Sequence, residues 1–181
     1  MGGRLRFVTT AIAFPSFRNH IEVVAVELDE LDLHIVGLLL KDARTPAAQI
    51  AEQIGLSRPA VADRLDKLER QGVIRGTTAV VDPAALGRSI TAFIAARGAT
   101  LSGPAWKKFR ELMRRDDVLE VHTVAGDDCF LVKVRAESIT ALNTLVQQLT
   151  AAPISFATRT TIVMETHCEK VGGIDLGANS K

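Results

Sequence analysis

The sequence predicts an α+β chain with two domains, a winged helix-turn-helix followed by a ferredoxin-like βαββαβ sandwich. In residues 28–82, three stretches of helical periodicity precede a β-branched run, and only three residues separate the second and third stretches. In residues 90–170, strand and helix patterns alternate in the order βαββαβ. Residues 83–89 are rich in turn-forming residues, and we interpret them as the linker between the domains.

The first helix is predicted over residues 28–41. Its apolar residues recur at helical spacing and share one face: Leu31, Ile35, Leu38 and Leu39. Asp29 or Asp32 favours the amino end and Lys41 favours the carboxyl end, because the helix dipole is positive at its start and negative at its end. These features define a helix that packs on one side only.

The second helix is short and is predicted over residues 47–54, with Thr45 as its N-cap and Pro46 as its first residue. Gly55 ends it, since glycine accepts the left-handed conformation found just past a helix. Only the segment 55–57 separates it from the next helix. So short a joint holds the two helices at a steep angle, which is typical of a helix-turn-helix.

The third helix is predicted to begin after Ser57, whose hydroxyl can accept a backbone N–H, and it carries Pro59 in its first turn. One stripe is apolar and consists of Val61, Leu65 and Leu68. The other face carries the cations Arg58, Arg64, Lys67 and Arg70. A helix with one buried and one cationic face suits the DNA major groove, and the alternative is an ordinary surface helix with a charged outer face.

After Gly72, residues 73–81 are rich in β-branched residues and are predicted to form a strand or a small hairpin wing. The charge of this domain is not basic, because residues 28–82 contain seven cations and nine acids, a net charge of −2. A strong non-specific grip on DNA is therefore not expected. Binding would depend on where the cations lie and on two or more copies acting together.

Composition sets the outer limits. The chain has 181 residues, is 47% hydrophobic and carries a formal net charge of +1, which fits one or two folded domains and excludes global disorder. No apolar run approaches the ~20 residues that a membrane-spanning helix needs. Two cysteines make no disulfide framework and are consistent with a reducing cytoplasm.

The two ends of the chain fall outside these patterns. Residues 1–27 are interpreted as a tail or an extra strand rather than a signal peptide, because their apolar run is short and lacks a clear cleavage site. We hypothesise that they come from a start site assigned too early. Residues 171–181 are predicted to be a flexible tail.

The second domain is predicted as strands over 90–97, 118–125, 129–135 and 154–165, with helices over 104–115 and between Ser138 and Pro153. The segment 126–128 is predicted to be a tight turn, because Gly-Asp pairs suit hairpin turns. In this order of elements both helices cover one face of the sheet. The other face stays uncovered by its own chain, and we expect it to pack against a second copy.

This ordered set of motifs resembles the Lrp/AsnC family of feast/famine transcriptional regulators, over about residues 28–170. The resemblance is carried by Leu28-Asp29-x-x-Asp32-x-x-Ile35, Gly55-Leu56-Ser57, Val61-x-x-Arg64-Leu65-x-x-Leu68-Glu69-x-x-Gly72-Val73-Ile74, Val81-Asp82-Pro83 and Val124-x-Gly126-Asp127. It implies a cytoplasmic, sequence-specific regulator of transcription. In such proteins the carboxy-terminal (RAM-type) domain dimerises, assembles further and binds a small effector, usually an amino acid.

The resemblance also implies how DNA is read. Each dimer would offer two recognition helices to half-sites about one helical turn apart. The residues expected near base edges lie at the start of the third helix and are Arg58, Pro59, Ala60 and Asp63. The residues expected at phosphates, which fix register more than they read sequence, are Ser57, Arg64 and Lys67.

For the effector, the resemblance points to the loop around Gly126 and to the last strand. The candidate residues are Val124, Gly126, Asp127, Asp128, Thr161 and Val163. The chain departs from the family at Cys129, where many members are acidic, and at Thr161, where many are aromatic, so the preferred ligand stays open. The alternative is that the segment 126–128 is only a hairpin turn.

Two other functions are alternatives for a chain with this two-domain plan. One is an architectural DNA-binding protein that needs no effector. The other is an enzyme, because sirohaem decarboxylases share this two-domain plan; the chain has no tyrosine and only His122 on the central hairpin, so no catalytic activity is expected. No cofactor is expected either. His122, Cys129, His167 and Cys168 do not follow a zinc-binding spacing, so no metal site is predicted.

Overall fold

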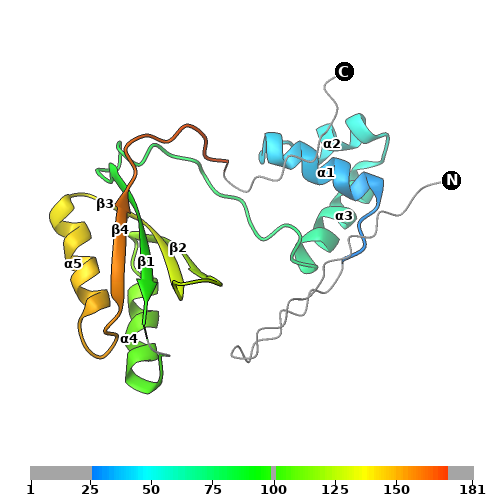
Figure 1. Cartoon of the computed structure of the whole chain (residues 1–181). Helices are drawn as coiled ribbons and strands as arrows, with labels where there is room; N and C mark the ends of the chain where they lie inside the picture. The colour runs from blue at the N-terminus through cyan, green and yellow to red at the C-terminus, as the bar shows by residue number, and fades with distance from the viewer. Residues whose placement is uncertain (1–25, 99–100, 171–181) are drawn as a thin grey trace. The chain divides into compact units, whose positions relative to one another are not determined.

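The computed structural model describes residues 26–98 and 101–170, and the predictions for residues 1–25 and 171–181 lie outside these ranges (Figure 1). The chain divides into two compact units, with the boundary between Ala79 and Val80. Within the described ranges, the first unit contains α1–α3, and the second contains a four-stranded sheet with α4 and α5.

The first helix, α1, spans Glu30–Lys41 within the predicted range. Both candidate aspartates act at its start. The Asp29 carboxylate accepts the Asp32 backbone N–H at 2.7 Å, and the Asp32 carboxylate accepts the Asp29 N–H at 3.4 Å. This reciprocal capping box fixes where the helix begins.

The second helix, α2, spans Ala47–Ile54, and the sequence-based prediction of its cap was wrong by one position. Pro46 is the N-cap, with an extended ψ of 145°, and not the first helical residue. The Thr45 hydroxyl does not cap the helix, because it donates to the Asp42 carbonyl at 2.7 Å and so closes the preceding turn. Gly55 ends the helix with φ of 70°, as expected for a left-handed residue.

The third helix, α3, spans Arg58–Arg70. Its N-cap is Ser57, whose hydroxyl accepts the Ala60 N–H at 3.4 Å, and Pro59 lies in the first turn as predicted. The three helices share a small core whose fully buried members are Ile35, Ile50, Val61 and Leu68. The helix-turn-helix expected from the short joint at residues 55–57 is therefore present.

The segment predicted to be a β wing forms no strand in the described part of the chain. Val73 and Ile74 fold back on α3, donating their N–H groups to the Leu68 carbonyl at 2.9 and 3.2 Å. Residues 75–82 are exposed, and Val80 is 76% exposed. β-branched residues favour a strand only where a neighbouring strand supplies hydrogen bonds, and no strand of residues 26–98 and 101–170 pairs with this segment.

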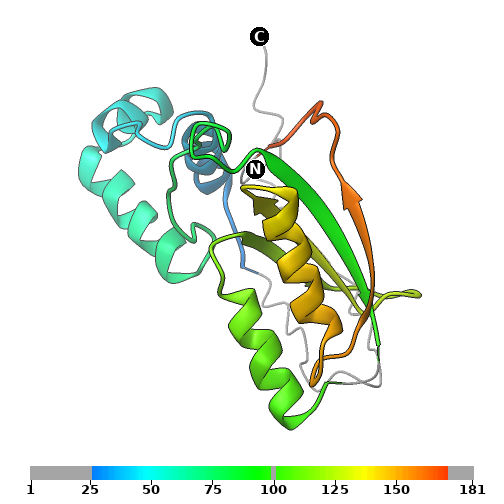
Figure 2. The same ribbon diagram turned by 90° about the vertical axis from the view of Figure 1, so that its left-hand side faces the viewer.

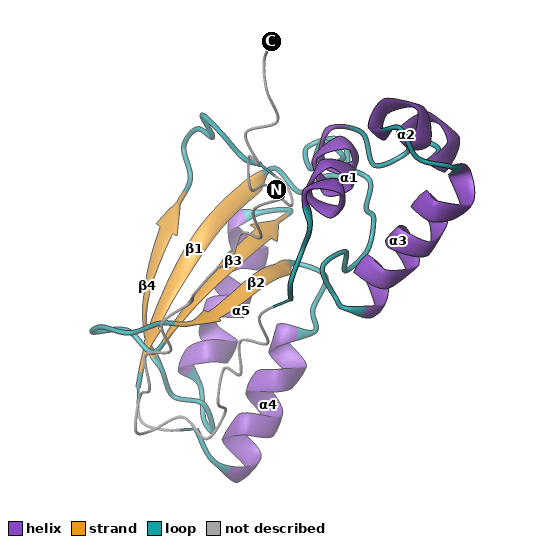
Figure 3. Ribbon diagram, turned by 90° about the vertical axis from the view of Figure 1, so that its right-hand side faces the viewer, coloured by secondary structure: helices purple, strands orange, loops and turns teal. Residues whose placement is uncertain are grey.

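The second unit is a sheet in the order β2-β3-β1-β4, with each neighbouring pair antiparallel (Figure 3). Its strands are β1 (Ile90–Arg97), β2 (Val118–Thr123), β3 (Phe130–Ala136) and β4 (Ala157–Ile162). Its helices, α4 (Gly103–Met113) and α5 (Ile139–Thr150), both lie on one face (Figure 2). This is the predicted ferredoxin-like βαββαβ arrangement.

Two predicted boundaries in this unit were wrong. The hairpin turn is a six-residue loop over 124–129 rather than a tight turn, closed by the Val124 N–H donating to the Cys129 carbonyl at 3.1 Å. The last strand begins only at Ala157, because Ile154 and Phe156 turn inward and are buried in the core. Its pairing with β1 fixes the remaining length.

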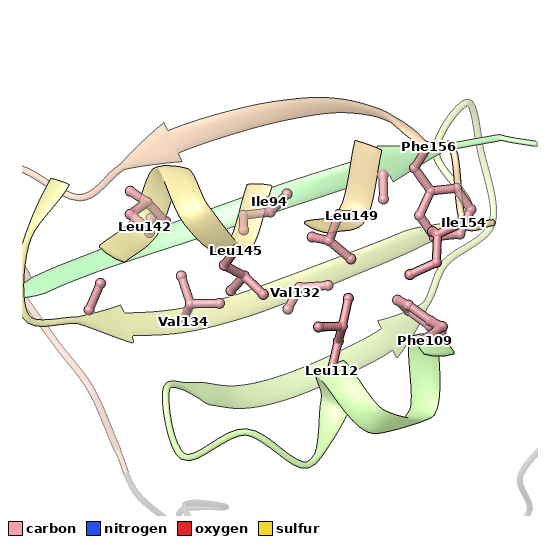
Figure 4. Packing of buried hydrophobic residues seen from close by; sticks show 13 residues of the cluster. Ile94, Phe109, Leu112, Val132, Val134, Leu142, Leu145, Leu149, Ile154 and Phe156 are labelled. Atoms are coloured by element: carbon pink, nitrogen blue, oxygen red, sulfur yellow. The ribbon is translucent and has the colours of Figure 1, made fainter. Parts of the chain in front are cut away.

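The core of the second unit lies between the sheet and its two helices (Figure 4). It is formed by Ile94, Val132 and Val134 from the sheet and by leucines and phenylalanines from the helices and the approach to β4. Phe109 of α4 stands at the centre of an aromatic group, 4.8 Å from Phe130 and edge-on to Phe156 at 5.6 Å, measured between ring centroids. This packing anchors the strand ends that carry the charged residues described next.

Candidate DNA-binding surface and effector loop

The first turn of α3 projects into solvent. Ser57, Arg58, Pro59 and Asp63 are exposed, and Ala60 is half-buried. Among the described residues, neither Arg58 nor Asp63 has an ion-pair partner. The short joint and the Ser57 cap therefore present an unpaired guanidinium and an unpaired carboxylate at the start of the helix that resembles a recognition helix.

The second half of α3 is different, because two of its cations are paired with α1. The Arg64 guanidinium lies 2.6 Å from the Asp32 carboxylate and 2.7 Å from that of Asp29. The Lys67 ammonium lies 3.2 Å from the other oxygen of Asp32. The Asp32 side chain is 0% exposed, so this carboxylate depends on Arg64 and Lys67 for its charge compensation.

The pKa shifts of Arg64 and Asp29 agree with the ion pairs between α1 and α3. The pKa of Arg64 is raised above its ordinary value by its hydrogen bonds to Asp29 and Asp32. Burial alone would raise the pKa of Asp29, but the Asp32 backbone N–H and the Arg64 guanidinium together hold it below the usual value. Both groups are therefore charged at neutral pH.

These pairs change what α3 shows to solvent. Its exposed charged residues are the cations Arg58 and Arg70 and the acids Asp63, Asp66 and Glu69. The outer face is thus not basic, in agreement with the net charge predicted for the domain. The sequence placed Arg64 and Lys67 at phosphates, and this placement stays a prediction, now for side chains that already have partners.

The loop over residues 124–129 gathers charged groups of both signs. Asp127 is 92% exposed at its side chain, whereas Asp128 is only 23% exposed. The Arg97 guanidinium, from the end of β1, lies 3.8 Å from Asp127 and 3.7 Å from Asp128. Arg159 of β4 reaches Asp128 at 3.3 Å.

The sequence analysis missed Arg97 and Arg159. The signal lay in the register of two strands distant in sequence, because Arg97 pairs with Ala157 and Ala95 pairs with Arg159. The predicted effector residues on β4 lie elsewhere: Thr161 pairs with Phe93. Phe93 lies four positions before Arg97 on β1, roughly 13 Å at ~3.3 Å per residue, so one chain does not bring Thr161 and the loop together.

The helix-free face of the sheet carries a second polar network. Lys133 of β3 bonds to Glu120 of β2 at 3.3 Å and also to Glu169, which follows β4. Arg135 reaches Glu169 at 2.6 Å, and His122 lies 3.0 Å from Glu120. The face expected to meet a second copy is therefore polar along β2 and β3.

The charges in this network are stabilised by one another. The hydrogen bond from His122 holds the pKa of Glu120 below its ordinary value, against the opposing effect of burial. The pKa of Lys133 is raised by its hydrogen bond to Glu169, and the pKa of Glu169 is lowered by the same contact. Glu120, Lys133 and Glu169 are therefore charged at neutral pH.

Residues 26–98 and 101–170 also bear on metal binding and on membrane insertion. No group of three or more histidine, cysteine, aspartate and glutamate side chains there is arranged to hold a metal ion. In the same ranges, no helix combines the length and the apolarity that crossing a membrane requires.

Comparison with known protein families defines the class of the protein. Residues 28–75 match the family model described as winged helix-turn-helix DNA-binding, and residues 91–172 match the one described as the Lrp/AsnC ligand binding domain. A DNA-binding helix-turn-helix joined to a ligand-binding domain is the plan of an effector-responsive transcriptional regulator.

Relatives identify the family. The HTH-type transcriptional regulator FL11 of Pyrococcus abyssi is 35% identical over 144 residues, which cover 80% of this chain and 94% of that protein. The leucine-responsive regulatory protein of Escherichia coli is 31% identical over 141 residues, covering 77% and 86%. The crystal structure of LrpA from Mycobacterium tuberculosis superimposes with a TM-score of 0.70 at 31% identity, covering 80% of this chain and 97% of that one. The chain belongs to the Lrp/AsnC family of transcriptional regulators.

Proposed function

We propose that the chain binds operator DNA as a homodimer through the first turn of α3, and that an amino acid controls this binding or the further assembly of dimers. The observation that carries the proposal is the division of α3. Arg58 and Asp63 are exposed and form no ion pair with any described residue, whereas Arg64 and Lys67 fasten the rest of the helix to the buried Asp32. A rigidly held helix with a free first turn suits base reading in the major groove.

Within that surface, Arg58, Pro59, Ala60 and Asp63 are proposed to approach base edges. Arg58 can offer two donors to a guanine, and Asp63 can accept from a cytosine amino group. Ser57 is proposed to lie at a phosphate. We assign Arg64 and Lys67 to positioning the helix, because a contact with phosphate would have to compete with Asp32.

The dimer is proposed to form through the helix-free face of the sheet. Lys133 and Glu169 lie on that side and are only 14% and 34% exposed at their side chains, so their ion pair can be buried further without leaving a charge alone. The two-fold relation would present two α3 helices to two half-sites. Because the outer face of one α3 is not basic, each helix alone would bind DNA weakly, and the two helices of a dimer would bind it more tightly together.

The effector is proposed to be an amino acid held near the loop 124–129, with Val124, Gly126, Asp127 and Asp128 as its contacts. Support comes from the match to the Lrp/AsnC ligand binding domain and from the relatives named leucine-responsive. Because Thr161 lies far along β4 from this loop within one chain, Thr161 and Val163 would join the site from another copy. We further propose that the protein acts in the cytoplasm and without catalysis.

The test is a thermal-unfolding screen of the full chain against the twenty amino acids, followed by DNA binding with any amino acid that stabilises it. A true effector raises the unfolding temperature by mass action and changes DNA affinity or oligomer size. An Asp128→Asn variant should lose the stabilisation, whereas Asp66→Asn, which changes an exposed acid of α3 outside the loop, should keep it. If no amino acid stabilises the chain while DNA binding is intact, the effector-independent architectural protein is the better description.

A further inference from the structure

A separate pocket opens at the end of the sheet far from the effector loop. It has a volume of about 430 Å³ and is lined by charged side chains of both signs: Arg88, Arg114, Arg115, Asp116, Asp117 and Glu137. The start of β1 and the end of β3 meet here, since Ile90 pairs with Ala136. The loop 124–129 adjoins the opposite end of β1, seven residues or roughly 23 Å away at ~3.3 Å per residue.

One ion pair forms a fixed part of the pocket. The Arg115 guanidinium donates to both oxygens of Asp117, at 2.8 and 2.6 Å, and to the Gln148 side chain at 3.4 Å. The Asp117 backbone carbonyl accepts the Arg135 N–H at 2.8 Å, which ties the turn to β3. Asp117 is buried and its charge is neutralised by Arg115, so this pair contributes shape rather than free charge.

The remaining charges have no partners among the described residues. Arg88 is half-buried and Arg114 is exposed, and no ion pair or hydrogen bond joins either guanidinium to a described side chain. Arg88 still acts on the pocket, because its charge contributes to holding the pKa of Asp117 below the ordinary value, after the larger effect of Arg115. Asp116 and Glu137 are likewise exposed and unpaired.

Two unpaired guanidiniums and two unpaired carboxylates in one pocket favour a ligand that carries both charges. A dianion would be repelled by Asp116 and Glu137, and a dication by the arginines. We propose that this pocket binds a small zwitterion, whose carboxylate lies at Arg88 and Arg114 and whose ammonium group lies at Asp116 and Glu137. Paired guanidinium and carboxylate contacts of this kind give both charge and direction.

The experiment follows backbone amide signals of the full chain by NMR during titration with glycine, acetate and methylammonium. We expect saturable shifts at residues 114–118 and 136–141 with glycine, at least tenfold weaker binding of acetate, and still weaker binding of methylammonium. Arg114→Gln should weaken glycine binding about tenfold. Glu137→Gln should weaken glycine binding but leave acetate unchanged or slightly stronger.

Lys107→Gln is the matched control, because Lys107 is an exposed cation of α4 outside the pocket lining, and it should bind glycine as the parent chain does. Unchanged fluorescence of Trp106, the single tryptophan, reports that each variant is folded. The proposal is overturned by the absence of saturable shifts at residues 114–118 and 136–141. Equal affinity for acetate and glycine, or unchanged binding in Arg114→Gln, would overturn it as well.

Discussion

Asp32 in the first unit and Asp117 in the second are the two charged side chains buried in the described part of the chain, and their partners differ. Asp117 is neutralised by Arg115, two positions away, so that this pair shapes a turn. Asp32 is neutralised by Arg64 and Lys67, more than thirty positions away, so that its pairs join two helices.

This difference in partners distinguishes cations that neutralise a buried carboxylate from cations that can contact a ligand or DNA. In the first unit the buried carboxylate takes two cations from the very helix whose charge pattern suggests a DNA contact. In the second unit the buried carboxylate takes only Arg115, which leaves Arg88 and Arg114 facing the same pocket. A charged face seen in sequence is therefore an upper limit on the charge offered to a partner.

The largest effect is expected from removing the Asp32 carboxylate, which joins α1 to α3. Asp32→Ala should destabilise the first unit by about 3 kcal/mol, because it leaves Arg64 and Lys67 without their shared partner. Amide hydrogen exchange of α1 and α3 in the full chain measures this. Asp63→Ala, an exposed acid of α3, should change stability by no more than about 0.5 kcal/mol. Equal protection of the α1 and α3 amides from exchange in both variants would contradict the stabilising role of Asp32.

The matching change in the second unit should have a smaller effect. Asp117→Ala should cost about 2 kcal/mol, because it leaves one cation without its partner instead of two, and that cation, Arg115, is 36% exposed at its side chain and can regain water. Urea unfolding followed by Trp106 fluorescence measures this, since that residue packs in the core of the second unit. Asp116→Ala is the control and should be nearly neutral. A loss at Asp117 larger than the loss at Asp32 would reverse the order proposed here.

Acid should weaken the second unit through the same pair. The Arg115 guanidinium holds the pKa of Asp117 below its ordinary value of 3.8, with burial acting in the opposite direction. A lowered pKa in the folded state gives stability that is complete above pH 3.8 and is lost as the pH falls through the lower, folded-state value. Unfolding of Asp117→Asn should therefore depend less on pH below about 4 than unfolding of the parent chain. The same pH dependence of unfolding in Asp117→Asn and in the parent chain would contradict a contribution of the Arg115–Asp117 pair to acid sensitivity.

The two serine caps sharpen the comparison further. The Ser138 hydroxyl accepts the Ala141 N–H at 3.0 Å, whereas that of Ser57 accepts the Ala60 N–H at 3.4 Å. Ser138→Ala should cost about 1 kcal/mol and Ser57→Ala less than that, because a long hydrogen bond is weak. Thermal unfolding of the two variants compares them. A larger effect at Ser57 would show that α3 depends on its cap more than its geometry indicates.

Much of the fold was predictable because its signals are local. The capping residues Asp29, Ser57 and Ser138, together with the left-handed Gly55, set helix boundaries within a few positions, and alternation identified β1 and β3. The strand predicted from the β-branched residues 73–81 is absent from the described part of the chain, because strand formation depends on a neighbouring strand as well as on residue type. The start of β4 was not predictable either, because it depends on Ile154 and Phe156 packing in the core against side chains distant in sequence.

The charged sites were predictable only in part. Residue type and spacing identified the recognition helix and the loop with Asp127. They did not reveal that Arg64 and Lys67 pair with Asp32, or that Arg97 and Arg159 reach Asp128, because these contacts join elements more than thirty positions apart. Only the packing of the helices and the register of β1 and β4 bring these groups together.

The most direct test of the account compares DNA binding by Arg58→Gln and Lys67→Gln at several salt concentrations, on DNA selected from a random pool by the parent chain. We predict that Lys67→Gln keeps the salt dependence of the parent chain and loses only stability, whereas Arg58→Gln loses discrimination between selected and unrelated DNA. A slope of log K against log salt that falls by about one per lost phosphate contact in Lys67→Gln, with unchanged stability, would contradict the positioning role of that lysine.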